Sequence, residues 1–159
     1  MPNVYISKPH HKQEQESSCI PACVRMMLEF FSIKLSESEL RLKLKTKLFG
    51  THIINILTIN DGPYGIHSAI EFWSLTELKN YLETFKTPCI VTLWTEYLNH
   101  WDSECLHSVV VHGFDDKHVI INDPNFEQKE FYIPFENFLN SWQINDGLVV
   151  LFNRTDNKK

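Results

Sequence analysis

The hydrophobic pattern of this chain changes at about residue 87, and the change limits the folds that the chain can adopt. Before it, apolar residues recur at the three- and four-residue spacing of amphipathic helices. After it come short β-branched runs separated by turn residues, such as CLHSVVVHGF and HVIIND. Because helices precede strands instead of alternating with them, the sequence predicts an α+β fold, with an antiparallel sheet packed on a helical half.

Two helix starts carry the Ser-x-x-Glu pattern of a capping box, at Ser36 and at Ser74. Another helix is expected to start near Cys19, where serines precede a wide apolar stripe and a proline falls in the first turn. Helices are therefore expected from Cys19 onward and at 36–44, 49–60, 74–85 and 134–142, and strands at 88–94, 105–114, 118–123, 128–133 and 147–152.

Length and composition indicate one domain over residues 1–159, with flexible ends at about 1–12 and 153–159. Hydrophobic residues make up 43% of the chain, enough for a core. The net charge of −5 and the lack of a basic run predict no nucleic-acid partner. No apolar segment has the length of a membrane span or a signal peptide, so a cytoplasmic protein with four reduced cysteines is expected.

Cys19 stands at the front of its helix, behind the polar run KQEQESS. A cysteine attacks as the thiolate, and both a helix N-terminus and a nearby imidazolium lower its pKa from about 8.5. Judged alone, Cys19 is better explained as a buried, inert core residue. Its interpretation therefore depends on whether partners lie elsewhere in the chain.

Three residues supply the possible partners. His107 begins a strand whose valines are apolar on both faces, and Asp123 ends the next strand, just before a proline. By itself, His107 is explained as a core histidine, and Asp123 is explained as a residue that forms a turn at the end of a strand. Together with Cys19 they can form a triad, in which the imidazole takes the thiol proton and the acid holds the ring. The amide of Gln13 and the N–H of Cys19 would then donate to an oxyanion.

Strand geometry sets a condition on this triad. Side chains alternate faces along a strand, and directly paired residues on antiparallel strands point the same way. With a regular two-residue turn at 115–116, Asp123 would pair with Ser108. The carboxylate would then lie on the face opposite His107, and the two side chains could not meet.

The triad therefore predicts an odd-numbered loop or one β-bulge between residues 112 and 118, with Gly113 as the favoured place for a bulge. In that register Val109 pairs with Asp123. The carboxylate and the imidazole of His107 then share a face of the sheet.

These motifs resemble a known family. Gln13, five residues and then CIPAC resemble the N-terminal motif of the bacterial papain-like cysteine peptidases that cut double-glycine leaders from bacteriocin precursors. His107, a run of valines and Asp123-Pro124 sixteen residues later resemble the histidine strand and the Asp-Pro of that family. The segments FGT at 49–51, SLTELKNYL and TPCIVTLW are similar to its intervening parts, so the resemblance covers nearly the whole chain.

The resemblance implies a papain-like fold and a peptidase that forms an acyl-enzyme intermediate without a cofactor. It assigns Cys19 as nucleophile, His107 as general base, Asp123 as orienting acid and Gln13 to the oxyanion hole. It also implies a peptide or protein substrate such as a leader or precursor peptide, and a separate transporter or precursor-peptide partner. Ile20 departs from the pattern, since the exporter-linked peptidases carry glycine after the nucleophile, and the CxPAC form is more like free-standing relatives.

Other functions remain open on the sequence. The same fold can serve as an inactive peptide-binding module, and the same triad can carry out deamidation or another acyl transfer. A zinc site would need about four converging ligands, and the available residues do not have that spacing (Cys105, His107, His112, His118 and the pair His10-His11). No metal is therefore expected. Trp94 and Trp101 flank a loop just before His107. Each has an ordinary explanation as a structural aromatic residue, and their position makes them the candidates for substrate contact.

Overall fold

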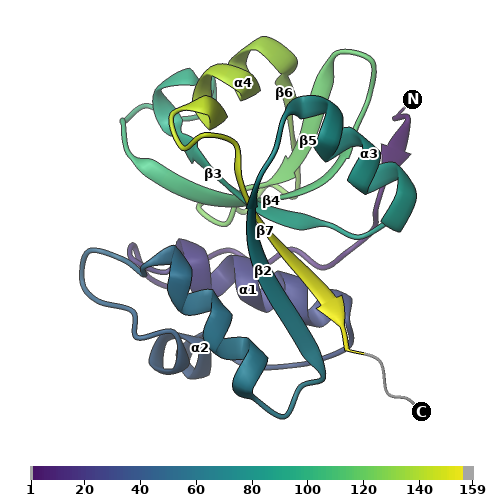
Figure 1. The fold of residues 1–159 in the computed structure, drawn as a ribbon. Coiled ribbons are helices and arrows are strands. Elements are labelled where there is room, and N and C mark those ends of the chain that lie inside the picture. The colour runs from purple at the N-terminus through teal and green to yellow at the C-terminus, as the bar shows by residue number, and fades with distance from the viewer. Residues whose placement is uncertain (1, 156–159) are drawn as a thin grey trace.

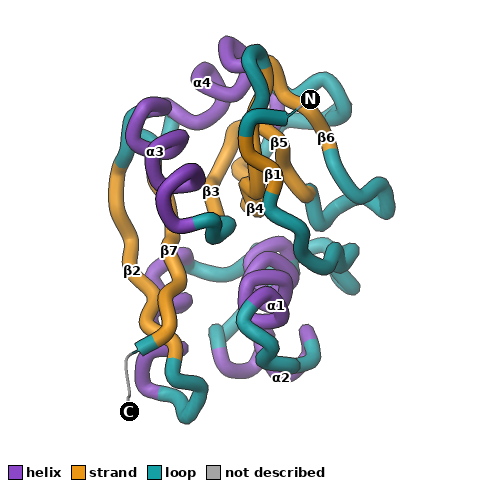
Figure 2. Tube along the Cα trace, turned by 90° about the vertical axis from the view of Figure 1, so that its right-hand side faces the viewer, coloured by secondary structure: helices purple, strands orange, loops and turns teal. Residues whose placement is uncertain are grey.

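Seven antiparallel strands form one sheet that separates two groups of helices (Figures 1 and 2). The structure is a computed structural model and describes residues 2–155. Its strands are β1 (Val4–Tyr5), β2 (Ile66–Phe72), β3 (Cys89–Trp94), β4 (Leu106–Phe114), β5 (His118–Asn122), β6 (Phe131–Pro134) and β7 (Leu148–Arg154). Its helices are α1 (Cys19–Phe30), α2 (Glu37–Lys43), α3 (Leu75–Phe85) and α4 (Phe135–Gln143), with 3-10 helices η1 (Ile53–Asp61) and η2 (Thr95–Tyr97).

The strand order is β2-β7-β3-β4-β5-β6, and β1 pairs with the end of β4 that extends past β3. Helices α1 and α2 lie on one side of the strands, while α3 and α4 lie on the other (Figure 2). The predicted α+β architecture, with a helical first half and an antiparallel second half, is confirmed.

Helix starts follow the capping patterns. Ser74 and Glu77 form a complete capping box at α3, in which each side chain bonds the other residue's backbone N–H. At α2 the Ser36 hydroxyl accepts from the N–H of Glu39. At α1 the N-cap residue is Ser18, whose carbonyl accepts the N–H of Ala22 at 2.9 Å, so Cys19 is the first residue of the helix.

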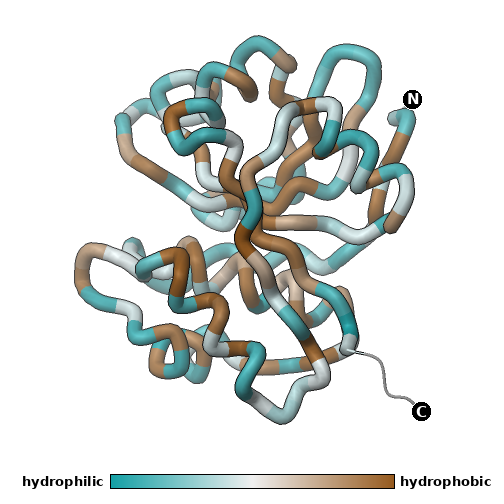
Figure 3. The backbone as a smooth tube through the Cα atoms, viewed as in Figure 1, coloured by the Kyte–Doolittle hydropathy of each residue, from teal (hydrophilic) through white to brown (hydrophobic). Residues whose placement is uncertain are grey.

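The core has two parts, one on each face of the sheet. Val109 and Val111 of β4 point into the part covered by α3 and α4, and Val110 points into the part covered by α1, α2 and η1. All three valines are fully buried, as expected for a strand with apolar residues on both faces. Apolar segments accordingly gather along α1 and the central strands (Figure 3). This double burial fixes β4 between the two layers, and β4 carries His107.

Two strands differ from the expectation. Val4–Tyr5, expected in a flexible end, pairs with Phe114 and Gly113 of β4, and Val4 is only 5% exposed. Ile66–Phe72 forms β2 and pairs with all seven residues of β7, which places residues 153–154 in the sheet as well. Thr155 follows, with its N–H bonded to the carbonyl of Gly65, and residues 156–159 of the expected flexible C-terminus lie outside the described residues.

The helix expected at 49–60 is also different. It begins at Ile53 and is a 3-10 helix over Ile53–Asp61. Asn60 at its end bonds the backbone of Ser68 in β2 through both its amide nitrogen and its carbonyl oxygen. These bonds attach the end of η1 to β2.

The β4–β5 hairpin contains the bulge that the triad requires. Val111 pairs with Ile121 but Gly113 pairs with Ile120, so His112 is the extra residue. The register beyond the bulge, Val110 with Asn122, continues to Val109 opposite Asp123. The bulge therefore places the carboxylate on the same face as the imidazole of His107.

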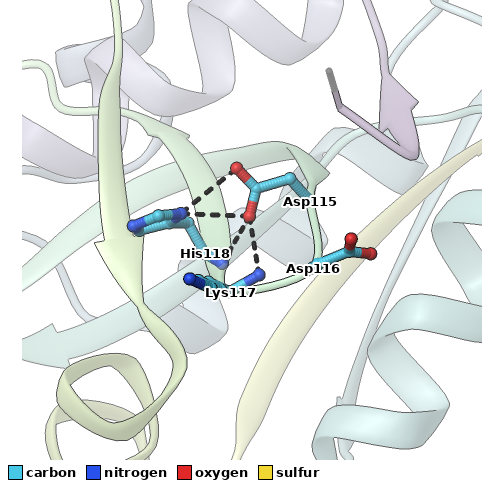
Figure 4. Close-up of a pocket in the computed structure, with 4 residues that line it drawn as sticks. All are labelled: Asp115, Asp116, Lys117 and His118. Carbon is cyan, nitrogen blue, oxygen red and sulfur yellow. Dashed lines mark hydrogen bonds and ion pairs between the residues drawn. The ribbon is translucent and has the colours of Figure 1, made fainter.

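The hairpin turn itself is tight. The N–H of Asp115 donates to the carbonyl of His118, and the Asp115 carboxylate accepts from the N–H groups of Lys117 and His118 and contacts the His118 ring (Figure 4). The small hollow at this turn is lined by these residues and Asp116. The turn is thus a two-residue turn at 116–117. The bulge is therefore the feature that moves the Asp123 side chain to the face of the sheet on which His107 lies.

Candidate active site

Cys19 begins α1, where the first-turn N–H groups have no acceptor within the helix. One helical turn later, Cys23 is fully buried and donates its thiol hydrogen to the carbonyl of Ser108 at 3.3 Å. The N–H of the same Ser108 bonds the Cys19 thiol. The start of α1 is thereby attached to β4 directly beside His107.

His107 lies between Cys19 and Asp123. Its Nε2 is 2.6 Å from Asp123 Oδ1, and its ring also hydrogen-bonds the Cys19 thiol. Because Nε2 faces the carboxylate, Nδ1 is the nitrogen that faces the thiol. The imidazole is only 4% exposed and the carboxylate is fully buried. The side chains of the predicted Cys, His and Asp therefore meet in space.

The charges of this group favour an ionised thiol. Burial opposes ionisation of Cys19, but the hydrogen bond and charge of His107 and the N–H groups of Ser108 and Ile20 outweigh burial and lower the pKa of the thiol. Burial by itself would lower the pKa of His107, but hydrogen bonds to Asp123 and Cys19 raise it to about 10. Both shifts favour the thiolate–imidazolium pair over the neutral pair.

Asp123 accepts four hydrogen bonds. Oδ1 accepts from His107 and from the N–H of Asn125 at 3.0 Å, and Oδ2 lies 2.8 Å from His100 Nε2 and 2.7 Å from Trp101 Nε1. Burial favours the neutral acid, but the bonds from His100 and His107 outweigh it and hold the pKa of the carboxyl well below its ordinary value. The acid is therefore ionised throughout the physiological range.

Gln13 is placed differently from the expectation. Its Nε2 donates to the carbonyls of Gln15 at 2.8 Å and Glu16 at 3.0 Å, and its Oε1 is buried without a partner among residues 2–155. A flipped amide would set Oε1 against two carbonyl oxygens, so these bonds fix its orientation. The N–H of Gln13 donates to the carbonyl of Pro124 at 2.6 Å. In this conformation Gln13 therefore braces the loop before Cys19.

The two tryptophans have different surroundings. Trp101 packs its ring 4.7 Å from that of His107, and it lines a hollow together with Cys19 and Gln13. Trp94 ends β3, and its carbonyl accepts from the hydroxyl of Ser141 at 2.6 Å. Trp101 therefore lies at the site that the sequence predicts, whereas Trp94 bonds α4, pairs with Leu106 of β4 and lines neither hollow at Cys19.

Two hollows meet at Cys19. One is lined by His107 and Trp101, the other by Ile20, Thr92 and Ser108. The two share Phe49, Gly50 and Leu106 as well as Cys19. The side chain of Ile20 is 7% exposed and forms part of one wall. The arrangement leaves room on both sides of the sulfur for a chain that crosses it.

His100 is a site residue that the sequence did not indicate, as are Ser108 and Asn125. It directly precedes Trp101 in the loop before β4, and both side chains bond the same oxygen of Asp123. A histidine next to a tryptophan in a loop that leads to His107 was the available signal. The partner of His100 is 23 residues away, so this signal does not say which residue the histidine bonds.

Neither metal binding nor membrane crossing finds support among residues 2–155. No three His, Cys, Asp or Glu side chains in that part of the chain are grouped as metal ligands would be. Its helices are all too short or too polar to cross a bilayer.

The comparison with family models gives the decisive result. The model of the Peptidase C39 family matches residues 7–157. The chain belongs to the Peptidase C39 family. It is accordingly a cysteine peptidase, as the motifs around Cys19 and His107 predict. None of the curated proteins matches the chain.

Solved structures support the fold of this C39 peptidase. The double-glycine motif protease of an AMS/PCAT transporter, determined with the leader peptide, has a TM-score of 0.75, is 23% identical, and 96% of each chain is covered. The peptidase domain of Streptococcus ComA, a bi-functional ABC transporter, has a TM-score of 0.75 at 23% identity, covering 92% of this chain and 97% of that one. A C39-like peptidase from Bacillus anthracis has a TM-score of 0.73 at 16% identity, covering 96% of this chain and 98% of that one.

Proposed function

We propose that Cys19, His107 and Asp123 are the catalytic triad of this C39 peptidase. The observation that carries the proposal is the position of His107, whose ring bonds the Cys19 thiol on one side and the Asp123 carboxylate on the other. The ionisation of the site supports it, since the pKa of Cys19 is lowered while that of His107 is raised.

The reaction follows from this arrangement. The Cys19 thiolate attacks the carbonyl carbon of the scissile peptide, and the His107 imidazolium gives its proton to the leaving amine. The product is a thioester between Cys19 and the acyl part of the substrate. His107, now neutral, takes a proton from water, whose oxygen attacks the thioester and releases the acid and the thiol. Asp123 keeps the imidazole oriented through both steps.

The negative oxygen formed during each attack needs donors. The N–H of Cys19, in the first turn of α1, is one. We assign the second to the amide of Gln13, which lines the same hollow as Cys19 and His107. To donate there, the amide exchanges its bonds to the Gln15 and Glu16 carbonyls for one to the oxyanion.

We propose a precursor peptide with a leader as the substrate. Two structures with a similar fold are a double-glycine motif protease in complex with a leader peptide and the peptidase domain of a bi-functional ABC transporter. In this chain, Phe49 and Leu106 border both hollows at the sulfur, so a peptide backbone that crosses Cys19 passes between them. Small residues at the cleavage site suit such a crossing. A separate transporter is included among the proposed partners.

A peptide-library digestion, read by mass spectrometry, tests this function. The wild type is expected to cut after a pair of glycines, and Cys19→Ala is expected to cut nothing. A matched peptide with valine in place of the second glycine is expected to be a poor substrate. Cleavage that persists in Cys19→Ala, or an intact library after wild-type digestion, would contradict the assignment of Cys19 as the nucleophile.

A further inference from the structure

His100 makes a direct contact with the catalytic group that the family motifs do not include. Its Nε2 lies 2.8 Å from Oδ2 of Asp123, the oxygen that does not face His107. An ionised carboxylate only accepts hydrogen bonds, so Nε2 of His100 carries the hydrogen of this bond. Asp123 therefore lies between two imidazoles, one on each of its oxygens.

The ring of His100 is held by its surroundings. It stacks on Phe131, at the start of β6, with ring centroids 3.9 Å apart and an interplanar angle of 13°. The ring of Phe126 meets it edge-on at 5.1 Å. The His100 side chain is 12% exposed. A ring fixed in this way by two aromatic neighbours gives its N–H one direction, toward the carboxylate.

The loop that carries His100 is anchored as well. The N–H of Trp101 donates to the carbonyl of Leu98 at 3.0 Å, and Leu98 is only 1% exposed. His100 and Trp101 then reach Oδ2 from one side, while His107 and the N–H of Asn125 reach Oδ1 from the other. Four donors on two oxygens fill the acceptor positions of the carboxylate and prevent its rotation.

We propose that His100 is a positioning residue of the peptidase: its imidazole holds the Asp123 carboxylate in the plane that orients the ring of His107. This inference rests on the proposed triad. Without the His100 donor, the fully buried carboxylate keeps Trp101 as its one donor on Oδ2, beside His107 and the N–H of Asn125 on Oδ1, and its plane is held less firmly. The orientation of His107 and its stabilisation as imidazolium both weaken as a result.

Two substitutions separate the donor from the ring. His100→Phe keeps an aromatic ring against Phe131 but has no donor. His100→Gln loses the ring, but its amide nitrogen can occupy the place of Nε2. We expect His100→Phe to lower kcat by about 10–100-fold with little change in KM, and His100→Gln to recover most of that loss. The same pair at His67, which is exposed on β2, is the matched control and leaves kcat unchanged.

The pH dependence of Cys19 alkylation supplies a readout that a purely structural role would not move. The ionisable groups that sense Asp123 besides His100 are His107, Cys19 through His107, Cys23 and His10. When the Asp123 carboxylate is held less firmly, its hydrogen bond to His107 weakens. The pKa of His107 then falls and that of Cys19 rises. Alkylation below pH 6 is then expected to slow about tenfold in His100→Phe, the equivalent of one pKa unit, and to stay near the wild-type rate in His100→Gln.

The outcomes are distinguishable. A wild type whose Cys19 alkylates like an ordinary thiol would overturn the triad itself. An activated wild type with an unchanged profile and kcat in His100→Phe would overturn only the inference on His100. Equal losses of kcat in the Phe and Gln variants, with both still folded by circular dichroism, would also overturn it, because the donor would then be irrelevant.

Discussion

Cys19 and Cys23, one helical turn apart on α1, both contact the main chain of Ser108. The Cys19 thiol accepts from the N–H of Ser108, and the Cys23 thiol donates to its carbonyl at 3.3 Å. Burial raises the pKa of Cys23 well above its ordinary value, so this thiol keeps the hydrogen that it donates. One residue of β4 thus aligns the nucleophile, and a second cysteine holds that residue in place.

The first prediction concerns this second cysteine. Cys23→Val removes the donor to Ser108 and leaves a buried carbonyl without a partner, which is expected to cost about 1–3 kcal/mol of unfolding free energy. Because the Ser108 N–H then points less well at Cys19, alkylation of Cys19 at pH 6 is expected to slow by up to about tenfold.

The matched control is Cys89→Val. Cys89 is also fully buried but lies in β3, in the core on the side of α3 and α4. Its substitution is expected to leave the alkylation profile of Cys19 unchanged. If both variants slow alkylation equally, the contact between Cys23 and Ser108 has no specific part in aligning the nucleophile.

The second prediction concerns the ionisation of the nucleophile. His107→Ala removes the group that lowers the pKa of Cys19 most strongly against burial. The pH profile of Cys19 alkylation by iodoacetamide is expected to move up to at least that of an ordinary thiol, about 8.5. A variant profile identical to that of the wild type would show that His107 does not activate the thiol.

The third prediction separates the two roles of Gln13. If its amide donates to the oxyanion, Gln13→Ala lowers kcat by about 10²–10³-fold with KM nearly constant. Steady-state kinetics on a cleaved peptide checks this. A variant that loses thermal stability but keeps its kcat would restrict Gln13 to the bracing contacts with the carbonyls of Gln15 and Glu16.

The fourth prediction concerns the close approach of β1 to β4. A Cβ at Gly113 would lie 2.3 Å from the carbonyl oxygen of Val4, so Gly113→Ala is expected to displace β1 and to lower the unfolding free energy by about 1–3 kcal/mol. Chemical denaturation measures the loss. The same substitution in a chain without residues 1–5 is expected to cost much less, because the clashing backbone is gone. Equal costs in both chains would mean that β1 is not the cause.

The fifth prediction is a pH dependence of stability. Burial and the nearby charge of Lys8 lower the pKa of His112 to about 3, and its Nδ1 donates to the carbonyl of Ile6. The unfolded chain binds a proton at this histidine near pH 6.5 but the folded chain does not, so stability falls as the pH drops from 6.5 toward 3.

Between pH 7 and pH 5, protonation of this one histidine in the unfolded chain is expected to lower the unfolding free energy by about 2 kcal/mol. Urea denaturation at both pH values, with His112→Asn as the comparison, isolates it, because the variant lacks that part of the pH dependence. A wild type and a variant that lose the same stability between the two values would indicate that His112 is protonated in the folded protein.

The sequence was sufficient for the parts of the site that have local signals. Cys19 is marked by its position at a helix start, His107 by the valine-rich strand and Asp123 by the proline that follows it. The requirement that His107 and Asp123 share a face predicts an odd-numbered loop or a bulge, and the structure has the bulge, at His112, one residue before the expected place.

The parts that were missed depend on distant contacts. Ile66–Phe72 contains Ser68 and Ala69 and has a weak strand pattern, but its pairing with β7, about 80 residues later, makes it a strand. Val4–Tyr5 is too short to be recognised and is ordered by Gly113, which has no side chain to exclude it. The role of His100 likewise depends on where the fold places Asp123.

The bulge in β4 has a consequence for other chains of this architecture. His107 and Asp123 are separated by an even number of positions, and a two-residue turn between regular strands would put them on opposite faces. A relative with an even separation therefore needs a bulge or a three-residue turn, whereas one with an odd separation can have a plain hairpin. An insertion or deletion of one residue between histidine and acid is thus tolerated only where the turn or the bulge changes with it.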